Sequence, residues 1–228
     1  MSTSFKRQEI QVIDDKLLTE GIVITGPQAN TRGELSLVEL APTTEVLAMS
    51  FKNIGRIENL VGFDNLTKLC LDNNSIQHIV NLNHLVNLRW LDLSFNKISV
   101  IEGLANLTKL EDLSLYSNRV SEIKGLEQCQ NLQCLSLGNN LIESLEQVIR
   151  LRQLKNLRML TLKGNPIYEE NEYKNAVLAY VDGLKYLDYA LVDSNELHVA
   201  KEQYHDELID IEEKESVVAE KASRDKIM

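Results

Sequence analysis

The chain has 228 residues, of which 43% are hydrophobic, and this is enough to bury a substantial core in one domain with appendages. Its formal net charge of −10 argues against nucleic acid and anionic membrane surfaces as partners, because both bind proteins through Lys and Arg. A protein partner is therefore favoured.

The N-terminal segment, residues 1–42, is predicted to cap the domain. It begins MSTSFKRQEIQVIDD, in which no long apolar run follows the basic pair, so we expect no signal peptide. No later stretch approaches the length of a membrane span. Apolar residues on both sides of a predicted loop at 24–33 are expected to cover the edge of the first strand.

Residues 43–167 contain a repeated motif. Four units align on an asparagine: LTKLCLDNNSI (66–76), LRWLDLSFNKI (88–98), LEDLSLYSNRV (110–120) and LQCLSLGNNLI (132–142). Their asparagines recur every 22 residues, and a fifth unit, LRMLTLKGNPI (157–167), follows after a longer interval of 25. The segment VLAMSFKNIGRI (46–57) is a degenerate first unit in which Lys52 replaces the asparagine.

Each unit reads Leu-x-x-Leu-x-Leu-x-x-Asn-x-Ile and continues as Ile-x-x-Leu-x-x-Leu. The pattern predicts an α/β leucine-rich-repeat solenoid of about six 22-residue repeats, in which short parallel strands form a concave sheet. The strand leucines point into the core, and the asparagine bonds backbone groups where the strand ends. A short helical stretch is expected to return the chain to the next strand.

The C-terminal part is predicted to close this core. Residues 168–193 follow Pro166 and are expected to form a cap. Residues 194–228 are highly charged, with Leu197, Tyr204, Ile211 and Val218 at intervals of seven. This spacing predicts one continuous helix, which is either the beginning of a coiled coil or a single helix that packs on the cap.

No motif indicates catalysis. The sequence contains no Gly-rich phosphate loop, no cluster with metal-ligand spacing and no nucleophile elbow, so we expect neither an enzyme nor a cofactor, metal or small-molecule substrate. Cys70, Cys129 and Cys134 are an odd number without close ligand spacing, which favours reduced thiols in the cytoplasm.

The side chains between the strand leucines are expected to form a protein-binding surface on the concave face. In the third and fourth repeats, aromatic residues, which often dominate interface energies, stand beside carboxylates that suit a partner rich in Arg or Lys. The predicted surface consists of Phe51, Arg89, Trp90, Asp92, Phe95, Asp112, Tyr116 and Met159. The alternative is that the aromatic rings pack against one another or under the terminal helix.

Several stretches resemble the family of dynein regulatory complex subunit 3, the leucine-rich-repeat component of the nexin–dynein regulatory complex in motile cilia and flagella. They are WLDLSFNKISVIEGL (90–104), LEDLSLYSNRVSEI (110–123), LQCLSLGNN (132–140), IRLRQLKNLRMLTLKGNPI (149–167) and YLDYALVD (186–193). The resemblance runs from about residue 12 to about residue 205.

This resemblance implies a non-enzymatic scaffold in the cytoplasm, attached to the cytoskeleton of the ciliary or flagellar axoneme. Its partners would be other subunits of the regulatory complex, and family members usually continue into a long C-terminal coiled coil. The 22-residue spacing is also similar to that of a nuclear regulator of protein phosphatase 1. The alternative function is therefore a regulatory or targeting subunit of that phosphatase.

Overall fold

The computed structural model describes residues 10–23 and 35–225, and over 218–225 it describes the backbone alone. The predicted loop at 24–33, the first nine residues of the predicted N-terminal cap and the side chain of Val218 lie outside this description.

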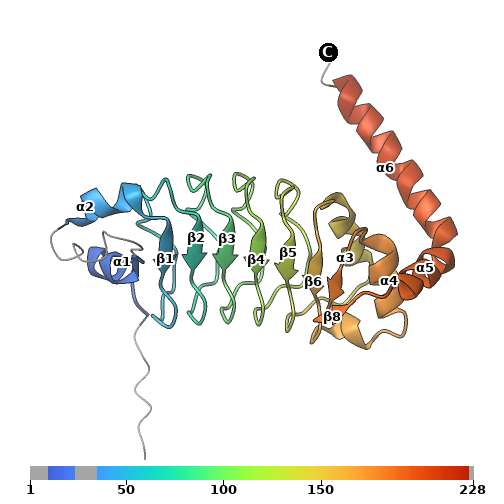
Figure 1. Ribbon diagram of the computed structural model, residues 1–228, viewed down its shortest axis with the longest axis horizontal. Coiled ribbons are helices and arrows are strands. Elements are labelled where there is room, and N and C mark those ends of the chain that lie inside the picture. Colours follow the sequence, from blue (N-terminus) through green and yellow to red (C-terminus); the bar gives the residue numbers. More distant parts are fainter. Residues whose placement is uncertain (1–9, 24–34, 226–228) are drawn as a thin grey trace, which may run out of the picture.

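The described chain forms a solenoid whose strands stand side by side in one sheet, as Figure 1 shows. The strands follow one another in chain order, and all neighbours are parallel until the final antiparallel pair. They are β1 (Val46–Ala48), β2 (Lys68–Cys70), β3 (Trp90–Asp92), β4 (Asp112–Ser114), β5 (Cys134–Ser136), β6 (Met159–Thr161), β7 (Tyr186–Leu187) and β8 (Ala190–Leu191). The predicted leucine-rich-repeat fold is confirmed.

The alternation of apolar and polar residues decides which side of each strand is buried. The central residue of every repeat strand, such as Leu91 or Leu113, is almost fully buried, while its neighbours on both sides reach the other face. Leucines from adjacent repeats stack because the register pairs Leu69 with Leu91 and Leu91 with Leu113. Stacking therefore supplies the core that a single repeat lacks.

The repeated asparagine joins neighbouring repeats. Asn96 accepts a hydrogen bond from the backbone N–H of Ile76 at 2.9 Å and donates to the carbonyls of Leu71 and Leu93 at 3.0 Å. Asn74 bonds the preceding repeat in the same way. A buried amide that links two repeats explains why the residue recurs at this position.

The return segments differ from the prediction. In the 22-residue repeats they are successive tight turns, such as the bonds from Leu85 N–H to the Leu82 carbonyl and from Leu88 N–H to the Leu85 carbonyl. The three-residue apolar spacing fits these turns without a regular helix. Helices form in the longer interval alone, as α3 (Glu146–Ile149) and η3 (Arg150–Gln153).

An N-terminal cap covers the edge of β1. It contains α1 (Asp15–Gly21), α2 (Leu37–Leu40) and the short 3-10 helix η2 (Ala41–Thr43). Ile22 forms an antiparallel bridge with Leu47, and the N–H of Val23 donates to the carbonyl of Val46. Backbone pairing at this edge satisfies groups that an open strand would expose.

The C-terminal cap is formed by η4 (Pro166–Glu169), α4 (Tyr173–Tyr180) and α5 (Ser194–Gln203), with Ala200 of α5 fully buried. The prediction of one continuous helix after residue 193 is wrong, because the helix breaks at Tyr204 and resumes as α6 (His205–Asp225). The Tyr204 ring meets the Tyr180 ring edge-on at the break, with 5.4 Å between their centroids. Tertiary contacts at the cap therefore override the seven-residue periodicity.

Candidate functional site

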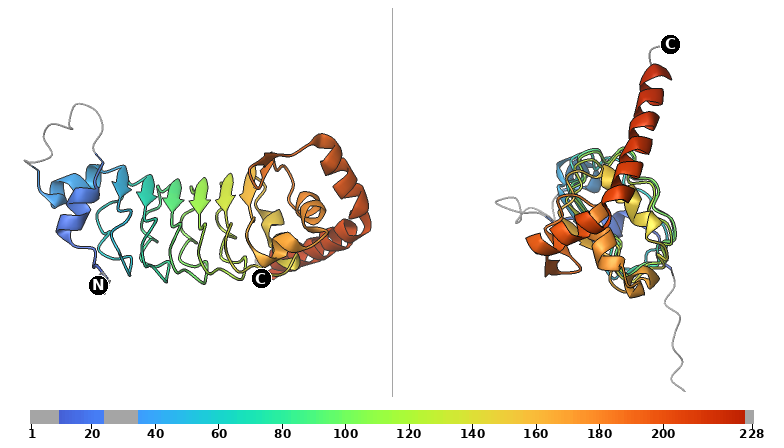
Figure 2. Two further views of the ribbon diagram at one scale, coloured as in Figure 1. Left: turned by 90° about the horizontal axis from the view of Figure 1, so that it is seen from below. Right: turned by 90° about the vertical axis from the view of Figure 1, so that its right-hand side faces the viewer.

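The sheet register arranges the concave side chains in rows that cross the repeats. One row contains Lys68, Trp90, Asp112, Cys134 and Met159, each paired with the next. Figure 2 shows α6 on the side of the solenoid away from the strands, so this helix does not cover the row. The predicted surface is therefore not packed beneath the terminal helix.

Trp90 lies at the centre of a polar network. The Lys68 ammonium is 3.8 Å from the centroid of the Trp90 ring, a cation–π contact, and Asp112 is the neighbour of Trp90 on the next strand. Burial raises the pKa of Asp112 above its ordinary value, and the nearby Asp92 adds to this rise. Hydrogen bonds from Cys134 and Trp90 and the charge of Lys68 oppose the increase in pKa.

Phe95 and Tyr116 form the aromatic part of the surface. Their ring centroids are 5.6 Å apart in an edge-to-face arrangement, and Phe95 remains 50% exposed. The Tyr116 ring lies over Gly138, where a Cβ atom would come within 2.8 Å of the ring, and its hydroxyl accepts a hydrogen bond from Asn139 at 2.7 Å. Contacts with Gly138, Asn139 and Phe95 thus hold the Tyr116 ring in place. The Phe95 ring packs on one side alone and keeps its other side open to solvent.

The backbone at Phe95 is unusual for an aromatic residue. Its φ of 54° lies in the left-handed region, and every repeat adopts positive φ at this position. The equivalent residues are Phe51, Asn73, Ser117, Asn139 and Gly164. Asn and Gly tolerate this conformation, whereas a bulky residue adopts it at a cost. A strained, exposed aromatic side chain is typical of a functional position.

Not all of the predicted residues lie together. Trp90, Asp92, Phe95, Asp112 and Tyr116 come from two adjacent repeats, and we call these five residues the central patch. The other three are Arg89, which forms an ion pair with Glu111 beside the patch, Phe51, in the first repeat, and Met159, in the last repeat.

The central patch is acidic. Asp92 and Asp112 belong to it, and Asp72 lies one repeat away, where Ser50 and Asn73 donate hydrogen bonds to its carboxylate. Lys68 is the neighbouring cation, and its ammonium lies over Trp90. Negative charge beside projecting aromatic rings suits a basic protein segment.

The described residues were also compared with the requirements of a metal site, a membrane span and a reactive thiol. They contain no group of three or more His, Cys, Asp or Glu side chains that could hold a metal ion. None of the described helices is both long enough and apolar enough to cross a membrane. Burial raises the pKa of the Cys129 thiol to about 11, and it also raises the pKa of Cys70 and Cys134, which disfavours reactive thiolates.

The C-terminal end of the sheet carries exposed residues that the repeat pattern does not predict. Tyr186 and Leu191 extend the row that contains Met159, and Tyr189 lies in the turn between β7 and β8. The stretch YLDYALVD has aromatic and aliphatic residues on both sides of Asp188, and this composition is a signal for a strand pair. The repeat pattern predicts only a cap over residues 168–193.

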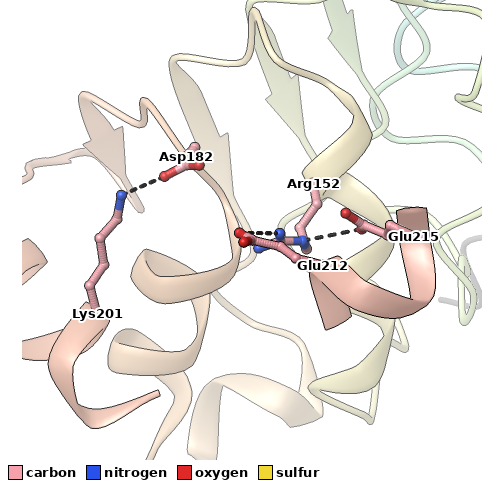
Figure 3. Close-up of polar contacts among 5 residues, drawn as sticks. All are labelled: Arg152, Asp182, Lys201, Glu212 and Glu215. Atoms are coloured by element: carbon pink, nitrogen blue, oxygen red, sulfur yellow. Dashed lines mark hydrogen bonds and ion pairs between the residues drawn. The ribbon is translucent and has the colours of Figure 1, made fainter. Parts of the chain in front are cut away.

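Salt bridges hold α5 and α6 to the solenoid, as Figure 3 shows. The Arg152 guanidinium, on η3, pairs with Glu212 at 3.3 Å and with Glu215 at 3.2 Å, both on α6. Lys201 of α5 pairs with Asp182 at 2.6 Å. The longer interval between repeats therefore supplies one contact to α6, and the Tyr180 hydroxyl of α4 supplies another, because it donates to Glu207 at 2.7 Å.

The comparisons with known proteins agree with this architecture. The leucine-rich-repeat family model matches residues 76–215. Dynein regulatory complex subunit 3 of Rattus norvegicus is 52% identical over 220 residues, which are 96% of this chain and 42% of the rat protein. The Mus musculus protein of the same name is 51% identical over 95% of this chain and 42% of its own length. The chain therefore spans less than half of the length of these relatives, and the resemblance stated from the sequence is confirmed.

Solved structures share the fold at lower identity. A chain in the Drosophila melanogaster SNF/U2A' complex has a TM-score of 0.53 and 22% identity, with 84% of this chain and 91% of that chain covered. An internalin C2 from Listeria monocytogenes has a TM-score of 0.62 and 24% identity, with 80% and 78% covered. At these identities the likeness concerns the fold alone.

Proposed function

The chain belongs to the leucine-rich-repeat family, and we propose that it is a protein-docking scaffold of the nexin–dynein regulatory complex. The observation that carries the proposal is the identity of 52% over 96% of the chain to a protein named as a subunit of the dynein regulatory complex. In this role the chain is not an enzyme. It acts in the axoneme of a cilium or flagellum, where it holds other subunits of the complex and so helps to regulate dynein-driven motility.

The central patch is the docking site in this proposal. Phe95 projects from the sheet, and Trp90 and Tyr116 present large ring surfaces beside it. Aromatic side chains of this kind often contribute about 2 kcal/mol or more to a protein interface. Asp92 and Asp112 provide the charge that would pair with Arg or Lys of the partner.

The proposal is tested in ciliated cells that lack the endogenous protein. The full-length protein should appear along the axoneme and should co-purify with other subunits of the regulatory complex. A Trp90→Ala, Tyr116→Ala double variant should lose this association while its melting temperature stays nearly unchanged. Val61→Ala, which alters an exposed valine of the first repeat, is the matched control and should behave as the parent protein.

Two results would overturn the proposal. One is the absence of the parent protein from the axoneme. The other is recovery of protein phosphatase 1 without axonemal proteins, which would support a phosphatase-targeting subunit instead. If the double variant unfolds, the two aromatic residues belong to the structural core, and the assignment of the central patch fails.

A further inference from the structure

The C-terminal end of the concave sheet carries an exposed apolar row. The register pairs Met159 with Tyr186 and Tyr186 with Leu191, so the three side chains come from adjacent strands. Met159 is 44% exposed, Tyr186 is 41% exposed and Leu191 is 70% exposed. Single exposed apolar residues are common on protein surfaces, but a contiguous group of this kind marks an interaction site more often.

Tyr189 adds a second, independent observation. Asp188 and Tyr189 form the two-residue turn between β7 and β8, with φ values of 48° and 70°. This turn type prefers Gly at its second position, because a side chain there is strained. The Tyr189 side chain is nevertheless 70% exposed, so burial does not compensate for the strain. The residue therefore has no stabilising role that explains its presence.

Asp188 explains how the strained turn is held. Its carboxylate accepts hydrogen bonds from the backbone N–H groups of Leu162 at 2.7 Å and Lys163 at 2.8 Å, and from the Tyr173 hydroxyl at 2.6 Å. Its own N–H donates to the carbonyl of Leu160 at 2.9 Å. These four bonds fix the hairpin against β6, so Tyr189 is presented in a defined position.

Exposed lysines stand near the row, whereas carboxylates stand near the aromatic rings of the central patch. Lys163, which follows β6, and Lys185, which precedes Tyr186, are both exposed, and the half-buried Arg158 precedes Met159. Asp182, Asp188 and Asp193 also lie close in sequence and keep their charge, but their oxygens already have partners. Asp188 accepts the bonds given above, Asp193 accepts from the first N–H groups of α5, and Asp182 pairs with Lys201. An apolar row between cations complements a segment that has apolar residues flanked by carboxylates.

We propose that Met159, Tyr186, Tyr189 and Leu191 form a second protein-docking surface, whose occupant is an acidic amphipathic segment of a partner protein. Its apolar side chains cover the row, and its carboxylates pair with Lys163 and Lys185. The proposal goes beyond the docking site at the central patch and does not depend on it, because the two surfaces share no residue.

The test uses methionine methyl and tryptophan indole NMR signals of the whole chain. Two synthetic helical peptides of about 18 residues share one leucine pattern, and their polar positions are all Glu in one and all Lys in the other. The Glu peptide should shift the methyl signal of Met159 until it saturates and should leave the buried Met49 unchanged. The Lys peptide should leave Met159 unchanged, and a shift of the single indole signal, from Trp90, would report separately on the central patch.

Variants make the assignment specific. Leu191→Ser and Tyr189→Gly should each weaken binding of the Glu peptide about tenfold or more, and Tyr189→Gly should melt at the same or a higher temperature because it removes strain. Val61→Ser, which changes an exposed valine at the other end of the solenoid, should have no effect on binding.

Three outcomes would overturn the proposal. The first is a Met159 signal that the Glu peptide does not shift or that both peptides shift equally. The second is unchanged binding in both the Leu191→Ser and the Tyr189→Gly variants. The third is a Met159 signal that depends on the concentration of the chain itself, which would assign the surface to a second copy of this chain.

Discussion

Phe95 occupies a backbone position at which its equivalents in neighbouring repeats are Asn73 and Ser117. Replacing it by Asn should relieve strain of about 1–2 kcal/mol and remove a ring contact with Tyr116 of about 0.5–1.5 kcal/mol. We therefore expect Phe95→Asn to change the free energy of unfolding by no more than about 1 kcal/mol in urea denaturation, while binding of a basic partner weakens. Ser117→Asn is the control, and a large loss of stability in Phe95→Asn would show that Phe95 is structural.

Asp112 allows a prediction about pH. Because the pKa of Asp112 is raised in the folded state, the Asp112 carboxylate binds a proton more readily in the folded protein than in the unfolded chain. The ionised carboxylate therefore lowers stability above the folded-state pKa, and this penalty disappears as the pH falls toward the ordinary value of 3.8. Asp112→Asn should thus be more stable than the parent protein at about pH 7, with a difference that closes at about pH 4.

The measurement for Asp112→Asn is the free energy of unfolding of parent and variant at each pH. Comparing the two proteins removes the contributions of other carboxylates, which they share. Asp64→Asn, at an exposed position, is the control and should show no such closing difference. A stability difference that is constant with pH would contradict the assigned cause.

At the scale of elements, repetition determined what the sequence could predict. The strands follow from Leu91 and its equivalents, because each repeat contributes the same residue types to the same layer. The break at Tyr204 could not be predicted, since it coincides with contacts to Tyr180, which lies far from it in sequence. The β7–β8 hairpin was missed because its turn is Asp188-Tyr189 rather than a typical Asn-Gly pair.

The repeat pattern also predicts which residues of the candidate site share a face, but it does not predict their conformations. Alternation along the strands placed Trp90, Asp112 and Tyr116 on one face, and the 22-residue spacing made adjacent repeats neighbours. The strain at Phe95 and the contact between Lys68 and Trp90 depend on backbone angles and rotamers, which the repeat pattern does not specify.

The attachment of α6 gives a prediction at the same scale. The Arg152 side chain is only 6% exposed, whereas Glu212 and Glu215 remain largely open to water. Because the carboxylates can be solvated when the pair is broken, Arg152→Ala should destabilise the attachment by about 1 kcal/mol. Hydrogen exchange of residues 205–216 should then be several-fold faster, with β2 to β5 unchanged.

Arg150→Ala is the matched control, because Arg150 is exposed and lies two residues before Arg152. Exchange in α5 should also stay slow in the Arg152→Ala variant, since Lys201 still pairs with Asp182. Unchanged exchange in α6 would show that the apolar contacts of Leu208 and Ile211 hold the helix without the arginine.

At the scale of the whole molecule, the concave face has two surfaces of opposite character. The central patch combines aromatic rings with carboxylates, and the C-terminal row combines apolar side chains with Lys163 and Lys185. Since α6 leaves from the opposite side, as Figure 2 shows, neither surface has to compete with it. The sheet face therefore stays uncovered while α6 is held against η3 by Arg152.

The solenoid should also be separable from α6 but not from its cap. A chain that ends after Tyr204 keeps α4 and α5, whose buried residues include Val177 and Ala200, so it should not aggregate and should melt only a few degrees lower. A chain that ends after Ile167 exposes the leucine layer of β6, including Leu160 and Leu162, and should aggregate or melt far lower. Circular dichroism melting and size-exclusion chromatography distinguish these outcomes. Unfolding of the longer chain would show that α6 is part of the cap, and normal melting of the shorter one would show that the last repeat needs no cover.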